Sequence, residues 1–319
     1  MRILLSTVLI VLSGIGVASA QDYPVRPVTI VLPAAAGGAT DILGRLVAQQ
    51  LSQQFGKQFV VENRVGAGGN IGTAAVAKAP RDGYTLLFTI SSSHAVSPLL
   101  YAQPGFDPVK DFDPVILVAR VPFLLVVHSS VPASSVKELI ALAKAQPGKI
   151  TYGSSGNGST NHLAGEMFKT MSGVDILHVP YKGVAAVLTD MLGGRIQVVF
   201  ASVPSVRSQL KDGNLRALAI TTLKRSALVP ELPPVGDTVK GYDVDFWVAL
   251  FTPSGTAKEI STKLYSGLTR ALAGADVRER FAAQGADVVG GSPDELATTL
   301  RADLAKWAKI VTATGVKID

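Results

Sequence analysis

Two glycine-bearing turns have the residue types and spacing that could bind a ligand. Residues 33–41 read PAAAGGATD, and residues 153–162 read GSSGNGSTNH. Each turn follows a short strand-like run and leads into a segment with helical spacing of apolar residues. A strand that turns directly into a helix places unpaired backbone N–H groups and the positive end of a helix dipole at one edge of a sheet. This arrangement binds anions.

The two turns differ in what they add to this backbone chemistry. In the first, Gly37 and Gly38 allow close approach to the backbone, and Thr40 or Asp41 can cap the following helix. The second offers serine, threonine and asparagine side chains and lacks the lysine of a phosphate loop. Neutral donors with a helix dipole suit a carboxylate at least as well as a phosphate. One such turn alone is most often a simple connection, so the prediction depends on there being two.

A third glycine-rich segment, residues 64–72 (RVGAGGNIG), resembles a dinucleotide fingerprint but fails its spacing. The glycines fall at positions 66, 68, 69 and 72, and Ile71 stands where the last glycine of G-x-G-x-x-G belongs. We therefore predict a packing loop here, and no cofactor.

Enzymatic chemistry has little support in the sequence. The histidines at positions 94, 128, 162 and 178 show neither H-E-x-x-H nor H-x-x-H spacing, and the chain contains no G-x-S-x-G. Cysteine is absent, which excludes disulfides, thiolate chemistry and cysteine metal sites. We predict no catalytic residue and no metal site, and an exported hydrolase remains the weaker alternative to a binding protein.

The first twenty residues predict an export signal. One basic residue, Arg2, precedes an apolar run that ends in Ala18-Ser19-Ala20, a small-residue pattern typical of signal-peptidase sites. We predict cleavage after Ala20. An uncleaved membrane anchor is disfavoured because the apolar run is near the lower length limit for a span.

Composition narrows the class of partner. The 319 residues include 30 basic and 24 acidic ones, only 6% are aromatic, and the basic residues are scattered, so nucleic acid is not an expected partner. The small excess of basic residues would attract small anions, and it would equally well keep the protein soluble. A chain of about 300 residues usually divides into two lobes.

Strand and helix signals alternate along the chain. Expected strands cover residues 28–32, 58–62, 84–90, 115–120, 123–128, 149–152, 175–179, 197–201, 215–221 and 245–252. Expected helices cover residues 42–55, 73–79, 95–101, 134–145, 163–168, 184–192, 260–272, 277–284 and 293–314, and residues 222–240 are expected to form a loop. This alternation predicts parallel sheets covered by helices, with ligands at the carboxyl ends of the strands.

Nine stretches in one order carry a resemblance to a known family. They are YPVRPVTIVLPAAAGGATD from Tyr23, VVENRVGAGGNIG from Val60, APRDGYTLL from Ala79, KDFDPV from Lys110, ITYGSSGNGSTNHLAGE from Ile150, HVPYKG from His178, LRALAIT from Leu215, SPDEL from Ser292 and AKWAKIV from Ala305. On these stretches the chain resembles the Bug family, the TctC-like periplasmic solute receptors of tripartite tricarboxylate transporters.

The resemblance implies a type II periplasmic-binding fold, in which two α/β lobes joined by two crossing strands close on a ligand in the cleft between them. We place the signal peptide at residues 1–20, the first lobe at 21–121 plus 250–319, and the second at 122–249. The implied function is capture of a small organic anion of carboxylate type by a periplasmic monomer without a cofactor. The implied partners are the membrane subunits of the transporter, with a sensor kinase as the alternative.

The resemblance also implies a set of ligand-binding residues. The first turn supplies Pro33, Ala34, Ala35, Gly37, Gly38, Thr40 and Asp41, and the second supplies Ser154, Asn157, Ser159 and Thr160. Ser91, Ser92, His94, Ala201 and Ser202 line the sides. Asp41 and Asp190 match family positions, but repulsion disfavours contact between an aspartate and a carboxylate, so each is a helix residue or a partner for a ligand amine.

One position departs from the family pattern. The first turn of the family usually carries phenylalanine after its proline, and Ala34 stands there in this chain. We hypothesise that the pocket is widened for a bulkier or aromatic carboxylate, with a compensating side chain from elsewhere as the open alternative.

Overall fold

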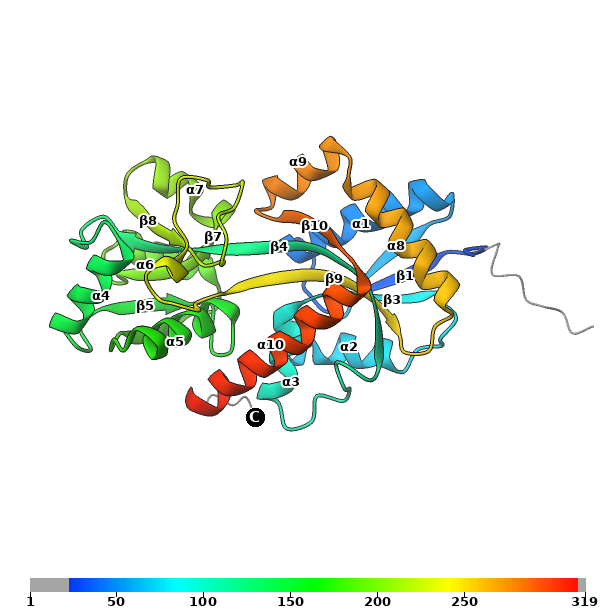
Figure 1. Ribbon diagram of the computed structural model, residues 1–319, viewed down its shortest axis with the longest axis horizontal. Coiled ribbons are helices and arrows are strands. Elements are labelled where there is room, and N and C mark those ends of the chain that lie inside the picture. The colour runs from blue at the N-terminus through cyan, green and yellow to red at the C-terminus, as the bar shows by residue number, and fades with distance from the viewer. Residues whose placement is uncertain (1–22, 315–319) are drawn as a thin grey trace, which may run out of the picture.

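The chain folds into two lobes joined by two long strands, as Figure 1 shows. The computed structural model describes residues 23–314, so the predicted export signal lies outside the described residues. The crossing strands, β4 (Phe112–His128) and β9 (Asp245–Pro253), pair antiparallel with each other. This architecture confirms the predicted two-lobed α/β fold, while the predicted lobe boundaries stay a prediction.

Both lobes are built on short strands that flank the crossing pair. These are β1 (Val28–Leu32), β2 (Phe59–Asn63), β3 (Thr85–Ile90), β5 (Thr151–Ser154), β6 (Leu177–Pro180), β7 (Val198–Ser202), β8 (Leu215–Ile220) and β10 (Asp287–Gly291). The path through the sheet is β2-β1-β3-β9-β4-β7-β5-β6, and β8 and β10 pair with β4. Within each lobe the outer strands are parallel, and they meet the crossing strands antiparallel.

Helices pack on both lobes (Figure 1). They are α1 (Ala39–Phe55), α2 (Asn70–Ala77), α3 (Ser97–Leu100), α4 (Val136–Ala145), α5 (Thr160–Ser172), α6 (Val184–Leu192), α7 (Val203–Lys211), α8 (Lys258–Leu272), α9 (Ala275–Ala283) and α10 (Pro293–Thr314). Short turns of 3₁₀ helix cover Ala67–Gly69 and Val235–Asp237, and one π-helical turn covers Ser92–Val96.

Three expectations about the elements are wrong. The separate strands expected at 115–120 and 123–128 are one strand, because β4 continues through Pro122, which is paired with Asp245 of β9. The sheets are mixed rather than parallel, since each crossing strand runs against the strands beside it. The helix α7 and the strand β10 were not predicted.

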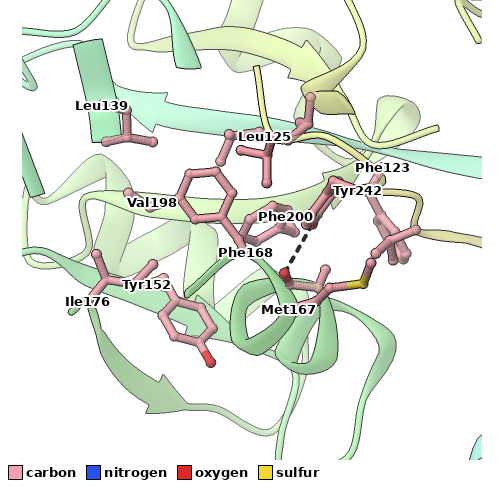
Figure 2. Packing of buried hydrophobic residues seen from close by; sticks show 14 of the residues in the cluster. Phe123, Leu125, Leu139, Tyr152, Met167, Phe168, Ile176, Val198, Phe200 and Tyr242 are labelled. Atoms are coloured by element: carbon pink, nitrogen blue, oxygen red, sulfur yellow. Dashed lines mark hydrogen bonds between the residues drawn. The ribbon is translucent and has the colours of Figure 1, made fainter. Parts of the chain in front are cut away.

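Aromatic packing fills the core of the second lobe. Phe168, Phe200 and Tyr242 are fully buried, and Figure 2 shows their rings packed together with Phe123 beside them. The Tyr242 hydroxyl donates a hydrogen bond of 3.0 Å to the Ala164 carbonyl oxygen, so its one polar atom is satisfied inside the core. This core holds the carboxyl end of β7 rigidly in place.

The last helix, α10, contacts the cores of both lobes. Near its start Leu296 packs with Trp247 of β9, and near its end Trp307 is buried in the core of the second lobe. Trp247 Nε1 also donates a 2.8 Å hydrogen bond to Asp303 of this helix. The helix therefore restricts how far the lobes can move about β4 and β9.

A close approach between α5 and β5 makes Gly165 sensitive to substitution. A Cβ atom added at Gly165 would lie 2.2 Å from the Tyr152 ring, which is fully buried. Gly165→Ala is therefore expected to lower the free energy of unfolding by about 1–3 kcal/mol, although alanine is the better helix former. Urea unfolding measures this, with Gly193→Ala as the control because its added Cβ meets only backbone oxygens at 3.6 and 3.7 Å. Equal stability of the two variants would contradict the prediction.

Candidate functional site

A cavity of about 310 Å³ lies between the second lobe, the crossing strands and the end of β3 in the first lobe. Its polar lining consists of neutral side chains: Ser92, Ser155, Ser159, Thr160, Asn161, Ser202 and Ser205. Its apolar lining consists of Ile90, Phe123, Val184, Phe200, Ala201 and Phe246. None of these lining residues is charged, so only dipoles and hydrogen bonds from this lining can stabilise a charge on a ligand.

The N-terminus of α5 forms one end of the polar lining. Ser159 is the N-cap, and its Oγ accepts a hydrogen bond from the His162 N–H. Asn161 Oδ1 accepts a 3.0 Å hydrogen bond from the Ser155 hydroxyl, which ties the turn to the helix start. The first N–H groups of any helix lack intrahelical acceptors, and the helix dipole adds positive potential. This end of the cavity therefore attracts an anion.

The N-terminus of α7 forms a second such end. Ser202 is the N-cap but makes no capping hydrogen bond with its side chain. The Ser205 hydroxyl donates to the Ser202 carbonyl oxygen at 2.7 Å, and both serines line the cavity. Two helix N-termini of the same lobe thus converge on one uncharged cavity. The sequence does carry a signal for the start of α7: a serine at position 202 followed by Pro204 is a common helix start.

Asp41 closes the first turn by accepting a hydrogen bond from the Gly37 N–H. Gly38, not Thr40 or Asp41, is the N-cap of α1. The Asp41 carboxylate accepts hydrogen bonds of 2.9 Å from the Gly37 N–H, from Arg45 Nε and from Asn63 Nδ2. Burial alone would raise the pKa of Asp41, but these hydrogen bonds outweigh it and lower the pKa to about 2. Asp41 therefore acts as a helix residue that shapes the turn.

The residues predicted for the site fall into separate groups. Ser92, Ser159, Thr160, Ala201 and Ser202 line the cavity together. Asn157 lines an adjacent cavity of about 250 Å³, while Ser91 and Ser154 are buried. The structure does not bring the first turn to either cavity, and its members Pro33, Ala34, Ala35, Gly37, Gly38, Thr40 and Asp41 are absent from both linings. Asp190 is also outside them, held by Tyr181 and Arg195 at 2.8 and 2.7 Å.

The prediction that His94 lines the cleft is wrong. The His94 side chain is fully buried, with its ring stacked on Phe251 at 4.5 Å and its Nε2 3.0 Å from the Pro108 carbonyl oxygen. Burial lowers the pKa of His94 to about 4. The residue is part of an aromatic core, whose members lie far apart in the sequence.

Residues 64–72 were predicted to form only a packing loop, but in the structure this segment also lines a cavity. Gly69 packs against Ser93, where an added Cβ would lie 2.6 Å from the serine side chain. Gly68, however, lines the 250 Å³ cavity together with Asn157 and Gly158 of the second turn. A glycine turn of the first lobe thus does face the second turn, but it is this segment.

The chain is similar to known proteins in sequence and in structure. Residues 43–316 match the family model described as the tripartite tricarboxylate transporter family receptor, TctC. The protein BugT of Bordetella pertussis is 37% identical, over 99% of this chain and 98% of its own. The chain belongs to the TctC receptor family.

Solved structures agree with this membership. Rpa4515 of R. palustris, solved with adipate, is 41% identical with a TM-score of 0.79, covering 93% of this chain and 99% of its own. MatC from Rhodopseudomonas palustris, with bound malate, is 29% identical with a TM-score of 0.74, covering 91% and 100%. TctC proteins are receptors for solutes rather than a family of enzymes. Within residues 23–314, no helix of this TctC receptor is long and apolar enough to span a bilayer.

Two stacked histidines support the second turn of this TctC receptor. The rings of His162 and His178 lie 4.0 Å apart, and His162 Nδ1 accepts a 3.0 Å hydrogen bond from the Gly158 N–H. His178 Nε2 is 2.6 Å from Ser154 Oγ, a distance that a serine hydrolase would also show. Ser154 is fully buried and its hydroxyl also contacts Gly156, so this pair holds the turn rather than facing the cavity.

This arrangement predicts a dependence of stability on pH. Burial, followed by the neighbouring His162, lowers the pKa of His178 to about 4 from its ordinary value of 6.5. Between these values the unfolded chain takes up a proton that the folded receptor does not, so stability is full above pH 6.5 and falls as the pH drops toward 4. His94 contributes with the same sign.

Chemical unfolding at several pH values between 4 and 7 measures this dependence. The variant His178→Phe keeps a ring in the stack and removes one titrating group, so its stability should fall less steeply over this range. A curve as steep as that of the wild type would contradict the role of His178.

Proposed function

We propose that this TctC receptor captures a small organic acid, with a carboxylate of the solute held at the N-termini of α5 and α7, and delivers it to the membrane subunits of a tripartite transporter. The convergence of two helix N-termini on an uncharged cavity carries this proposal. The adipate and malate seen in two related structures are carboxylates, which supports the same class of solute.

Simple magnitudes make binding without a cationic side chain feasible. A micromolar solute needs about −8 kcal/mol. Each helix N-terminus contributes roughly 0.3–2 kcal/mol, and each hydrogen bond to a charged group roughly 1.5–3 kcal/mol. Four or five such bonds offset the loss of translational and rotational freedom. The hydroxyls of Ser155, Ser159, Ser202 and Ser205 donate to other protein atoms in this structure. The donors in this proposal are therefore the side chains of Ser92, Thr160 and Asn161 and the backbone N–H groups at the starts of α5 and α7.

The first turn completes the site when the lobes close. In this proposal the backbone of residues 33–40 moves onto the solute from the first lobe, and Asp41 keeps the turn in shape through Gly37. Ala34 then leaves more room beside the solute than the phenylalanine usual in the family. Closure would also join the surfaces of both lobes that the membrane subunits contact.

Export precedes this function. We propose that residues 1–20 direct the chain to the periplasm and are removed after Ala20. Mass spectrometry of the protein purified from the periplasmic fraction measures the N-terminus, and a chain that starts at Met1 would contradict the proposal.

The direct test of the function is a thermal-shift screen of organic acids, amino acids and aromatic carboxylates. A ligand that binds only the folded receptor raises its melting temperature. We expect carboxylates to raise it and their uncharged amides to leave it unchanged, because the amide lacks the charge that the helix dipoles stabilise. Equal shifts from acids and amides, or no shift from any acid, would overturn the proposal.

A further inference from the structure

One wall of the cavity is apolar and aromatic. Phe123 of β4 and Phe246 of β9 lie side by side there, with ring centroids 5.7 Å apart and planes at 55°. Ile90 and Val184 extend the apolar lining beside this aromatic wall. The wall lies where β4 and β9 separate. It lines the cavity without any movement of the lobes.

The aromatic wall is held in place by the protein core. Phe123 is 8% exposed and belongs to the core of the second lobe together with the fully buried Phe200 (Figure 2). Phe246 packs against the cores of both lobes. Because these rings are already packed, a ligand meets a preformed apolar surface and does not have to order it.

The polar and apolar halves of the cavity meet directly. Phe123 is the register partner of Ser202, the N-cap of α7, so a carboxylate at this helix start has its carbon skeleton next to the rings. The rings offer no donor or acceptor to a hydroxyl group. A polar substituent placed against these rings would lose its water without replacement, which is costly.

The cavity has room for a sizeable skeleton. A cavity of about 150 Å³ lined by apolar side chains holds one benzene. The 310 Å³ here are about twice that, which leaves room for a six-membered ring or a six-carbon chain together with its carboxylate head.

We infer that this receptor selects acids whose skeleton beyond the carboxylate is apolar, a six-carbon chain or ring, and discriminates against hydroxylated acids of the same size and charge. The inference rests on the proposed function, since it places the carboxylate at the starts of α5 and α7. The property of the solute that the aromatic wall recognises is its apolar carbon skeleton.

Two matched pairs of acids test the inference by calorimetry on the wild-type receptor. Adipate and galactarate share chain length and charge and differ in four hydroxyl groups, and cyclohexanecarboxylate and quinate differ in the same way on a ring. We expect the apolar member of each pair to bind about a hundredfold more tightly, with a negative heat-capacity change that marks burial of apolar surface. Equal affinities within the pairs overturn the inference and leave the proposed function standing. A receptor that binds none of the four acids, nor any other carboxylate of the thermal-shift screen, fails the proposed function itself.

A pair of variants assigns the selectivity to the wall. Phe246→Leu keeps an apolar side chain and should keep the preference for adipate over galactarate. Phe246→Asn puts an amide in the same place, so it should weaken adipate binding about tenfold and reduce the preference. Thermal unfolding checks that both variants fold. If either does not, Val184→Asn, at the half-buried start of α6, supplies the same polar change in the lining. An unchanged preference in a folded asparagine variant overturns the role of the wall.

Discussion

Replacing Ser159 by aspartate is expected to weaken binding of an acid by about a thousandfold while leaving the receptor folded. Ser159 is the N-cap of α5 and lines the cavity. Aspartate is an equally good N-cap, and its charge interacts favourably with the helix dipole. Both effects offset the loss of the hydrogen bonds that the Ser159 hydroxyl donates to the Gly156 carbonyl oxygen and to Asn161 Oδ1. Two like charges about 4 Å apart at an effective dielectric constant of about 20 repel by about 4 kcal/mol, which corresponds to the expected loss of affinity.

The matched control is Ser159→Asn. Asparagine caps a helix as well as aspartate and has nearly the same shape, but it carries an uncharged NH2 donor in place of one carboxylate oxygen. Calorimetry with the acid that gives the largest thermal shift should show a much smaller loss for asparagine than for aspartate. If both variants bind that acid alike, the anion does not sit at the start of α5, and the proposed site is wrong.

Local sequence signals predicted the elements that carry the site, because short apolar runs and glycine turns act over a few residues. The strand at 28–32 and the return strand from Asp245 match β1 and β9 within one residue. The continuity of β4 was not predictable in this way. Pro114 and Pro122 interrupt the pattern locally, and only pairing with β9, far along the chain, shows that the strand continues.

The site residues, too, were predicted where the signal lies in neighbouring residues and misplaced where it depends on residues far along the chain. The start of α5 was predicted because Ser159 and the glycines before it are a local signal. The helix α7 was missed because its sequence, VPSVRSQLK, is mostly polar, although Val203 and Val206 are buried. His94 was placed wrongly because Phe251, on which its ring stacks, lies far along the chain.

The crossing strands should be sensitive to loss of a single cation. Arg120 of β4 contacts Asp245 of β9 at 2.8 Å, and Asp245 is only 4% exposed. Arg120 Nη2 also donates to Thr299 of α10 at 3.3 Å, so one guanidinium joins both strands and the last helix. Arg120→Ala is expected to lower the free energy of unfolding by about 3–5 kcal/mol, because it leaves a buried carboxylate without its partner.

The double variant Arg120→Leu/Asp245→Leu distinguishes a buried charge from lost packing. Removing both charges and filling the space with apolar side chains should restore most of the stability. The pH dependence supplies an independent check. Burial already raises the pKa of Asp245 despite Arg120, so without Arg120 the carboxyl protonates more readily, and the deficit of the single variant should shrink between pH 7 and about pH 4. Guanidinium unfolding at both pH values measures these differences. A deficit that is the same at both, or that persists in the double variant, would mean that the strands depend on the arginine side chain for packing rather than for its charge.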